Sequence, residues 1–164
     1  MEDQLTAERR CATYRIYNEL HASRAAFPKK TLRAVFTEMM YADPSAWRAV
    51  GITRAALEAY RAAGKNKIQG IERAHLTDRW RMIEHVFERE APLTKDELFA
   101  YWEETDRVVI ALRGENRQNV LGEWIPFDNE DGRLFPRLGI GFNYRHAIEG
   151  DFVRRLAEEI GANT

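Results

Sequence analysis

The chain has 164 residues, 45% of them apolar and 31% charged, with a net charge of −1. This length allows one globular domain, or a small domain with an accessory lobe. No stretch approaches the roughly 18 consecutive apolar residues of a membrane-spanning helix, and the charged start MEDQLTAERR is unlike a secretory signal. We therefore expect a cytoplasmic protein without a membrane partner. The single cysteine, Cys11, excludes an internal disulfide and a cysteine-rich zinc site.

Charge is distributed unevenly along the sequence. Residues 24–81 hold twelve Lys or Arg against five Asp or Glu, whereas residues 82–132 hold five against thirteen. A basic segment of this kind favours a surface that binds a polyanion, and an acidic one favours a face toward metal or solvent. The alternative is that the two segments attract each other or are simply solvated.

The first third of the chain predicts helices. Apolar residues at helical spacing predict one helix over residues 4–24 and another over residues 31–40. Asp43 is a typical N-cap and Pro44 a typical first helical residue, so a short helix is expected from there to Val50.

Residues 44–63 resemble a helix-turn-helix. Gly51 would form the turn, Thr53 would cap the second helix, and the following run to Ala63 is strongly helix-forming. In this motif the second helix enters the major groove of DNA. The alternative is an ordinary helical hairpin, and Trp47 departs from the motif because alanine is common four residues before the turn glycine. The predicted DNA contacts are Thr53, Arg54, Glu58, Arg61, Lys65 and Lys67.

The second part of the chain predicts strands and helices. KIQGIERAHL predicts a strand that ends near His75, and RVVIAL, residues 107–112, predicts a second one. Two helices lie between them, the later one beginning at the capping box of Thr94 and Glu97. GENRQN predicts a short helix after the second strand, and a last amphipathic helix spans residues 146–160. The expected fold is α+β and mostly helical. A helix-turn-helix-like lobe over 1–66 would pack on a ββα core with a C-terminal helix over 67–164.

His75 and Asn116 are the residues at which we expect chemistry. A neutral imidazole can polarise an attacking water, and one divalent metal can stabilise a scissile phosphate. Carboxylate and amide oxygens suit Mg²⁺ or Mn²⁺, and Arg117 would add positive charge beside the phosphate. These residues predict metal-dependent phosphodiester hydrolysis. The alternative is that His75 is a hydrogen-bonded structural residue.

The segments GIERAHL and RVVIALRGENR resemble the HNH (ββα-metal) endonuclease family. In that family one strand ends in a His, often as Asp-His-Ile, an Asn precedes the second strand, and the helix supplies a final His or Asn. The resemblance covers residues 67–121 at most. It implies that His75 is the general base, that Asp106 takes roughly the place of the middle Asn, and that Asn116 is a metal ligand. Ala74 stands where the family has a metal-binding Asp, so another acid would have to replace it: Asp78, Glu72 or Glu115.

Three functions are consistent with these observations. The first is a DNA endonuclease similar to type II restriction or phage-encoded nucleases, which would form a homodimer if it cuts both strands of double-stranded DNA. The second is a non-catalytic helix-turn-helix DNA-binding protein or regulator, which Ala74 favours. The third is a helical interaction protein whose charge asymmetry serves protein partners.

Overall fold

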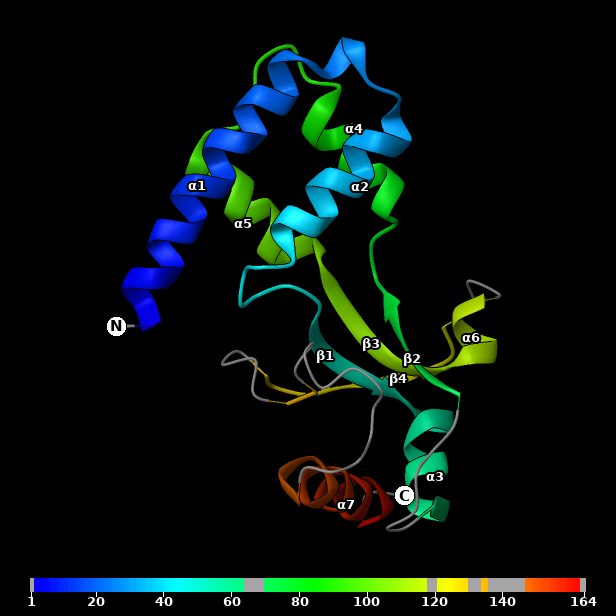
Figure 1. The fold of residues 1–164 in the computed structure, drawn as a ribbon. Helices are drawn as coiled ribbons and strands as arrows, with labels where there is room; N and C mark the ends of the chain where they lie inside the picture. Colours follow the sequence, from blue (N-terminus) through cyan, green and yellow to red (C-terminus); the bar gives the residue numbers. More distant parts are fainter. Residues whose placement is uncertain (1, 64–69, 118–120, 130–133, 136–146, 163–164) are drawn as a thin grey trace. The chain divides into compact units, whose positions relative to one another are not determined.

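The computed structural model describes residues 2–63, 70–117, 121–129, 134–135 and 147–162 (Figure 1). The prediction of an α+β, mostly helical fold is confirmed. The elements, in chain order, are α1 (Glu2–Ala22), the 3-10 helix η1 (Arg24–Ala26), α2 (Lys29–Met40), β1 (Arg48–Thr53), α3 (Arg54–Ala63), β2 (Ile71–His75), α4 (Arg79–Phe87), α5 (Lys95–Thr105), β3 (Arg107–Leu112), α6 (Arg113–Arg117), β4 (Trp124–Pro126) and α7 (Ala147–Ala162).

The chain forms two compact units, each built from separate stretches of sequence. Unit 1 is Met1–Ala46 with Leu76–Arg107, and unit 2 is Trp47–His75 with Val108–Thr164. The helices α4 and α5 of unit 1 are thus inserted between the strands β2 and β3. The boundary predicted between residues 66 and 67 falls inside unit 2.

Unit 1 is helical, and α1, α2, α4 and α5 surround an aromatic core. Phe36 lies edge-on to Phe87 and to Trp102, with ring centroids 5.5 and 5.6 Å apart. Tyr17 is fully buried, and its hydroxyl donates to the carbonyl oxygen of Val86 across 3.1 Å. Its polar end is therefore satisfied within the core.

Side-chain caps begin two of these helices. Thr94 and Glu97 form the predicted capping box of α5, each accepting the other's backbone N–H. Asp78 caps α4, because its carboxylate accepts the N–H of Trp80 across 2.6 Å. Both first turns are therefore fixed by local sequence.

The helix predicted over residues 44–50 is wrong, and with it the helix-turn-helix around Gly51. Residues 48–53 form the strand β1. The Asp43 carboxylate does not begin a helix there, because it accepts the N–H and hydroxyl of Ser45 and pairs with Arg10 of α1. Val50, Ile52 and Thr53 are β-branched, which favours the strand that follows.

Unit 2 contains a four-stranded sheet in the order β2-β3-β1-β4. The outer pairs are antiparallel, with Ile71 opposite Leu112 and His75 opposite Val108 in one of them. β1 and β3 are neighbours and run in the same direction, so the helices that follow them, α3 and α6, begin at the same end of the sheet (Figure 1). On one face the sheet packs against α3 and α7 through a core that includes Ile52, Tyr60, Val108, Ile110, Phe135 and Val153.

Gly51 lies inside β1 and is buried, not in a turn. A Cβ atom added there would lie 2.3 Å from Cε3 of Trp124 and 2.9 Å from the carbonyl oxygen of Ile125, both on β4. The glycine is therefore explained by the close approach of β4.

Buried polar side chains hold the backbone of Phe135. Arg73 on β2 donates to its carbonyl oxygen, and Glu149 on α7 accepts its N–H across 2.9 Å. Both charged side chains are at least nine-tenths buried. Phe135 has a φ of 52°, which is unfavourable for a residue with a side chain and persists only when its surroundings impose it.

Candidate active site between β2, β3 and α6

The strand–strand–helix order predicted around His75 is present. β2 ends at His75, β3 spans the predicted residues 107–112, and α6 follows it directly. Because side chains alternate along a strand, Ile71, Arg73 and His75 share the face that packs on α3 and α7, with Glu72 and Ala74 on the opposite face.

His75 is half-buried and contacts an aromatic ring. The indole of Trp47 meets the imidazole edge-on, with ring centroids 4.6 Å apart and planes at 81°. Trp47 has a φ of 57°, and it shares a positive φ only with Phe135 among the non-glycine residues that the structure describes. In the sequence, Trp47 stands out only as a departure from a helix-turn-helix, and no local pattern predicts its contact with His75.

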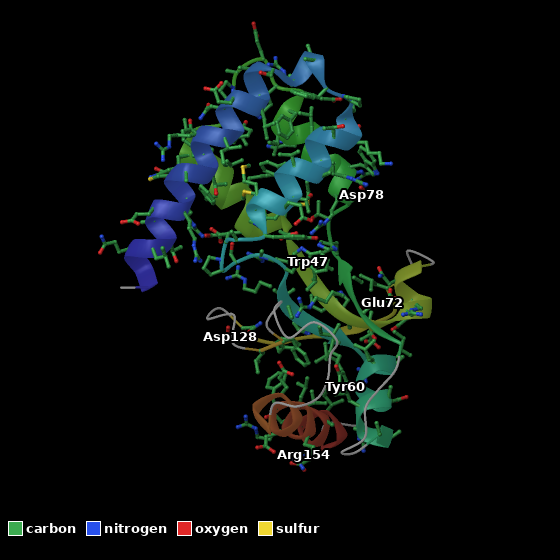
Figure 2. All side chains as sticks on the ribbon, in the orientation of Figure 1. Trp47, Tyr60, Glu72, Asp78, Asp128 and Arg154 are labelled. Atoms are coloured by element: carbon green, nitrogen blue, oxygen red, sulfur yellow. The ribbon has the colours of Figure 1, made fainter. Side chains whose placement is uncertain are left out.

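Asn116 contacts a carboxylate that resides on β2. Its Nδ2 donates to Oε2 of Glu72 across 3.0 Å, and Nε of Arg113 donates to Oε1 of the same carboxylate across 2.7 Å. Figure 2 shows Glu72 on the side of β2 that faces α6. Glu72 is two residues before Ala74 on the same strand face, so an acid does lie near the place that the resemblance left empty.

Glu115 connects the C-terminal ends of the strands β1 and β3. Its Oε2 accepts the Thr53 hydroxyl and the Leu112 N–H, each across 2.8 Å. The Thr53 oxygen in turn accepts the N–H of Ala56 and so caps α3. Glu115 therefore uses this oxygen to hold α6 against β1.

The structure does not bring His75 and Asn116 together. Asn116 contacts Glu72, which is three residues before His75 on β2, a separation of about 10 Å along a strand. Glu72 and His75 also project from opposite faces of the sheet. The two residues that the HNH resemblance joins around one metal are thus apart.

Asp106 and Asp78 lie at helix ends of unit 1. Asp106 follows the last residue of α5, is buried, and has its Oδ1 3.4 Å from Nη2 of Arg79. Asp78 is the exposed cap of α4. Both carboxylates thus have local structural roles in that unit.

The predicted DNA contacts fall into three groups. Thr53 is completely buried, so the prediction that it contacts DNA is wrong. The other predicted residues on α3 are exposed, and one of them, Arg54, pairs with Glu123 across 2.9 Å. Since β1 precedes α3, that helix is not the second helix of a helix-turn-helix. Lys65 and Lys67, and the side chain of Arg117, lie outside the described residues.

The basic and acidic segments of the sequence do not correspond to the two units. Unit 1 holds twelve Lys or Arg against fifteen Asp or Glu, and unit 2 holds thirteen against eleven. Each unit is thus close to neutral. The uneven charge along the sequence therefore makes neither unit strongly basic or strongly acidic.

No group of three or more His, Cys, Asp or Glu side chains that could hold a metal occurs within the described part of the chain. A hollow of about 390 Å³ in unit 1 is lined by residues from Arg24 to Leu32 and from Ile83 to Glu88, and none of the predicted site residues is among them. Among the described helices, none is both long and apolar enough to cross a membrane.

Comparisons of the chain with protein-family models, curated proteins and solved structures found no match. The likeness to HNH endonucleases therefore rests on the two short segments of sequence alone.

Proposed function

We propose that this chain hydrolyses phosphodiester bonds of double-stranded DNA with a divalent metal, at a site formed by Glu72 and Asn116. The observation that supports this most directly is the 3.0 Å contact between Asn116 and Glu72. It places a carboxylate beside the residue that the HNH resemblance makes a metal ligand. The acid comes from the same strand face as Ala74, two residues earlier.

The donor set fits Mg²⁺ or Mn²⁺. Such ions prefer oxygen ligands and are commonly bound by one or two carboxylates together with substrate phosphates and water. Neighbouring ligands of an octahedral ion with bonds of about 2.1 Å are about 3 Å apart, which matches the Glu72–Asn116 separation. Asn116 would present its amide oxygen after a rotation of the amide group. Glu72 and Asn116 would hold the ion, which supplies positive charge for the phosphate and the leaving oxygen.

His75 has a structural role in this proposal. It is on the other face of β2 and packs against Trp47, so its imidazole is not directed to the Glu72 carboxylate. The activity expected from the sequence is thus kept, with Asn116 as a metal ligand and Glu72 as the acid, but without His75 as the general base.

The DNA substrate is proposed from the HNH resemblance and from the exposed side chains of Arg54 and Arg61 on α3, which suit phosphates. A homodimer, with one site for each strand, would cut both strands of a duplex. A non-catalytic DNA-binding protein is the competing function, and it needs only the exposed arginines.

The test is incubation of the purified chain with mixed plasmid DNA in magnesium, in manganese and in chelator. We expect discrete cleavage that chelator abolishes and that Glu72→Gln lowers about 100-fold or more. Glu84→Gln, at an exposed position of α4 in unit 1, is the matched control and leaves cleavage unchanged. Loss of a general base costs about 100-fold or more, whereas we expect His75→Ala to change the rate less than about threefold.

Two results would reject the proposal. The absence of cleavage with either metal, together with salt-dependent DNA binding, would leave the non-catalytic function. Cleavage that His75→Ala abolishes and Glu72→Gln leaves intact would place the site on the other face of β2.

A further inference from the structure

One surface of unit 1 combines an exposed tryptophan with cations. The helices α2 and α4 contact each other (Figure 1), and Cζ of Arg33 on α2 lies 4.1 Å from the centroid of the Trp80 ring on α4. Of the four tryptophans of the chain, Trp80 alone is exposed, at 39%. Lys30 is one turn before Arg33 on α2, and Arg81 follows Trp80 on α4. We call these four residues the Trp80 patch.

The three cations of the Trp80 patch form no ion pair with a carboxylate of the described residues. Lys29 on α2, by contrast, pairs with Glu84 and Glu88. Arg79 on α4 pairs with Asp106 across 3.4 Å. The carboxylate one turn after Trp80, that of Glu84, is thus already engaged by Lys29. The patch therefore carries positive charge that the fold does not use, and such charge favours a polyanionic partner.

An exposed indole beside unpaired cations fits a single-stranded nucleic acid. Every base has a π face that can stack on an aromatic ring, and the phosphates of the same strand can pair with neighbouring cations. The bases of a duplex are stacked on each other, so they are not free to cover the indole. A lipid surface fits less well, because a helix that binds one inserts a broad apolar face, and the apolar face of α4 is buried in the core of unit 1.

We propose that the Trp80 patch binds single-stranded nucleic acid, with one base stacked on the indole and the adjacent phosphates paired with the three cations. The contact of Arg33 with the indole is a cation–π interaction, which holds the ring in place beside a phosphate-binding group. All four residues belong to unit 1. The inference therefore goes beyond the proposed function and does not rest on the site at Glu72.

The experiment measures binding of a fluorescein-labelled oligothymidine by fluorescence anisotropy, in chelator and at a series of salt concentrations. Three phosphate contacts to a single strand predict a slope of about −2 for the logarithm of the binding constant against the logarithm of the salt concentration. An abasic strand of equal length should bind about 5- to 100-fold more weakly, because it has phosphates but no base to stack.

Variants separate the stacking from the charge. Trp80→Leu should weaken binding of oligothymidine about 5- to 100-fold, leave the abasic strand unaffected and keep the salt slope. Trp80→Phe retains an aromatic ring and should recover part of the loss. Lys30→Gln should reduce the slope by about 0.7 and weaken binding of both strands equally. Arg15→Gln, at an exposed position of α1 in the same unit, is the matched control and should behave as the unmodified chain does.

Three results would overturn the proposal. They are the absence of oligothymidine binding in low salt, equal affinity of the unmodified chain for the two strands, and an affinity for oligothymidine that Trp80→Leu leaves unchanged. Binding to vesicles with phosphatidylserine that depends on Trp80, without binding to oligothymidine, would assign the patch to a membrane surface instead. Because chelator is present throughout, none of these results depends on metal-dependent cleavage. Circular dichroism of each variant establishes that an altered affinity does not come from unfolding.

Discussion

The hydroxyl of Thr53, the last residue of β1, donates to the carboxylate of Glu115 on α6 across 2.8 Å. Thr53 is completely buried, and Glu115 also accepts the N–H of Leu112 at the end of β3. The short helix with Asn116 is thus tied to the ends of two neighbouring strands. A helix of five residues has no stability of its own in water, so these bonds define its position.

Replacing Thr53 by valine tests that connection. The variant keeps the shape of the side chain but leaves Glu115 and the Ala56 N–H without their shared partner. We expect the free energy of unfolding to fall by about 1–2 kcal/mol, measured by urea denaturation. Thr105→Val is the control, because the Thr105 hydroxyl donates to the carbonyl oxygen of Tyr101 in its own helix, and it should cost less. An equal loss in the free energy of unfolding for the two variants would contradict the role of Thr53 in connecting β1 to α6.

Gly51 offers a second test, of the close approach between β1 and β4. An alanine Cβ at this position would overlap the indole of Trp124, so Gly51→Ala should lower the free energy of unfolding by about 1–3 kcal/mol. Gly114 has no heavy atom within 4 Å of such a Cβ and lies in α6. Gly114→Ala should therefore be neutral or stabilise by up to about 1 kcal/mol. Urea titrations that rank the two variants in the opposite order would contradict the pairing of β1 with β4.

The Asp43 carboxylate should make the stability of unit 1 depend on pH. Burial raises its pKa, but hydrogen bonds from Arg10 and Ser45 lower it by more, so the pKa is below its ordinary value in the folded chain. A carboxyl group with a lowered pKa stabilises the folded state above its unfolded pKa of about 3.9, and that contribution disappears as the pH falls through the folded pKa.

Asp43→Asn should consequently be less stable than the unmodified chain at pH 7. We expect the difference in the free energy of unfolding to shrink as the pH falls from about 5 to about 2, in urea titrations at a series of pH values. Glu123→Gln, at an exposed pair with Arg54, should show little difference at any pH. A difference for Asp43→Asn that stays constant over this range would show that the carboxylate's charge is not what stabilises the fold.

The sequence predicted elements whose signals are local, and it failed where distant residues decide. The capping box at Thr94 and the strand at residues 107–112 are correct because cap residues and β-branched runs act within a few positions. Asp43 and Pro44 also look like a helix start. There the Asp43 carboxylate is taken by Arg10, thirty-three residues away, which no local pattern reveals.

The candidate site also has one feature that local sequence predicts and one that depends on distant residues. Alternation along β2 is enough to place Glu72 and His75 on opposite faces, and this could have been inferred from GIERAH alone. The face of β2 that contacts Asn116 could not be inferred from the sequence. It depends on the contact between α6 and β2, which forms only after the chain has passed through β3.

The most direct test of the account is the position of a bound paramagnetic ion. In ¹⁵N-labelled chain titrated with Mn²⁺, the amide resonances of the residues nearest the ion broaden first, and for the proposed site these are Glu72, Arg113 and Asn116. Glu72→Gln should abolish this selectivity, whereas Glu84→Gln should preserve it. Broadening centred on any other part of the chain, or none at all, would contradict a metal site between β2 and α6.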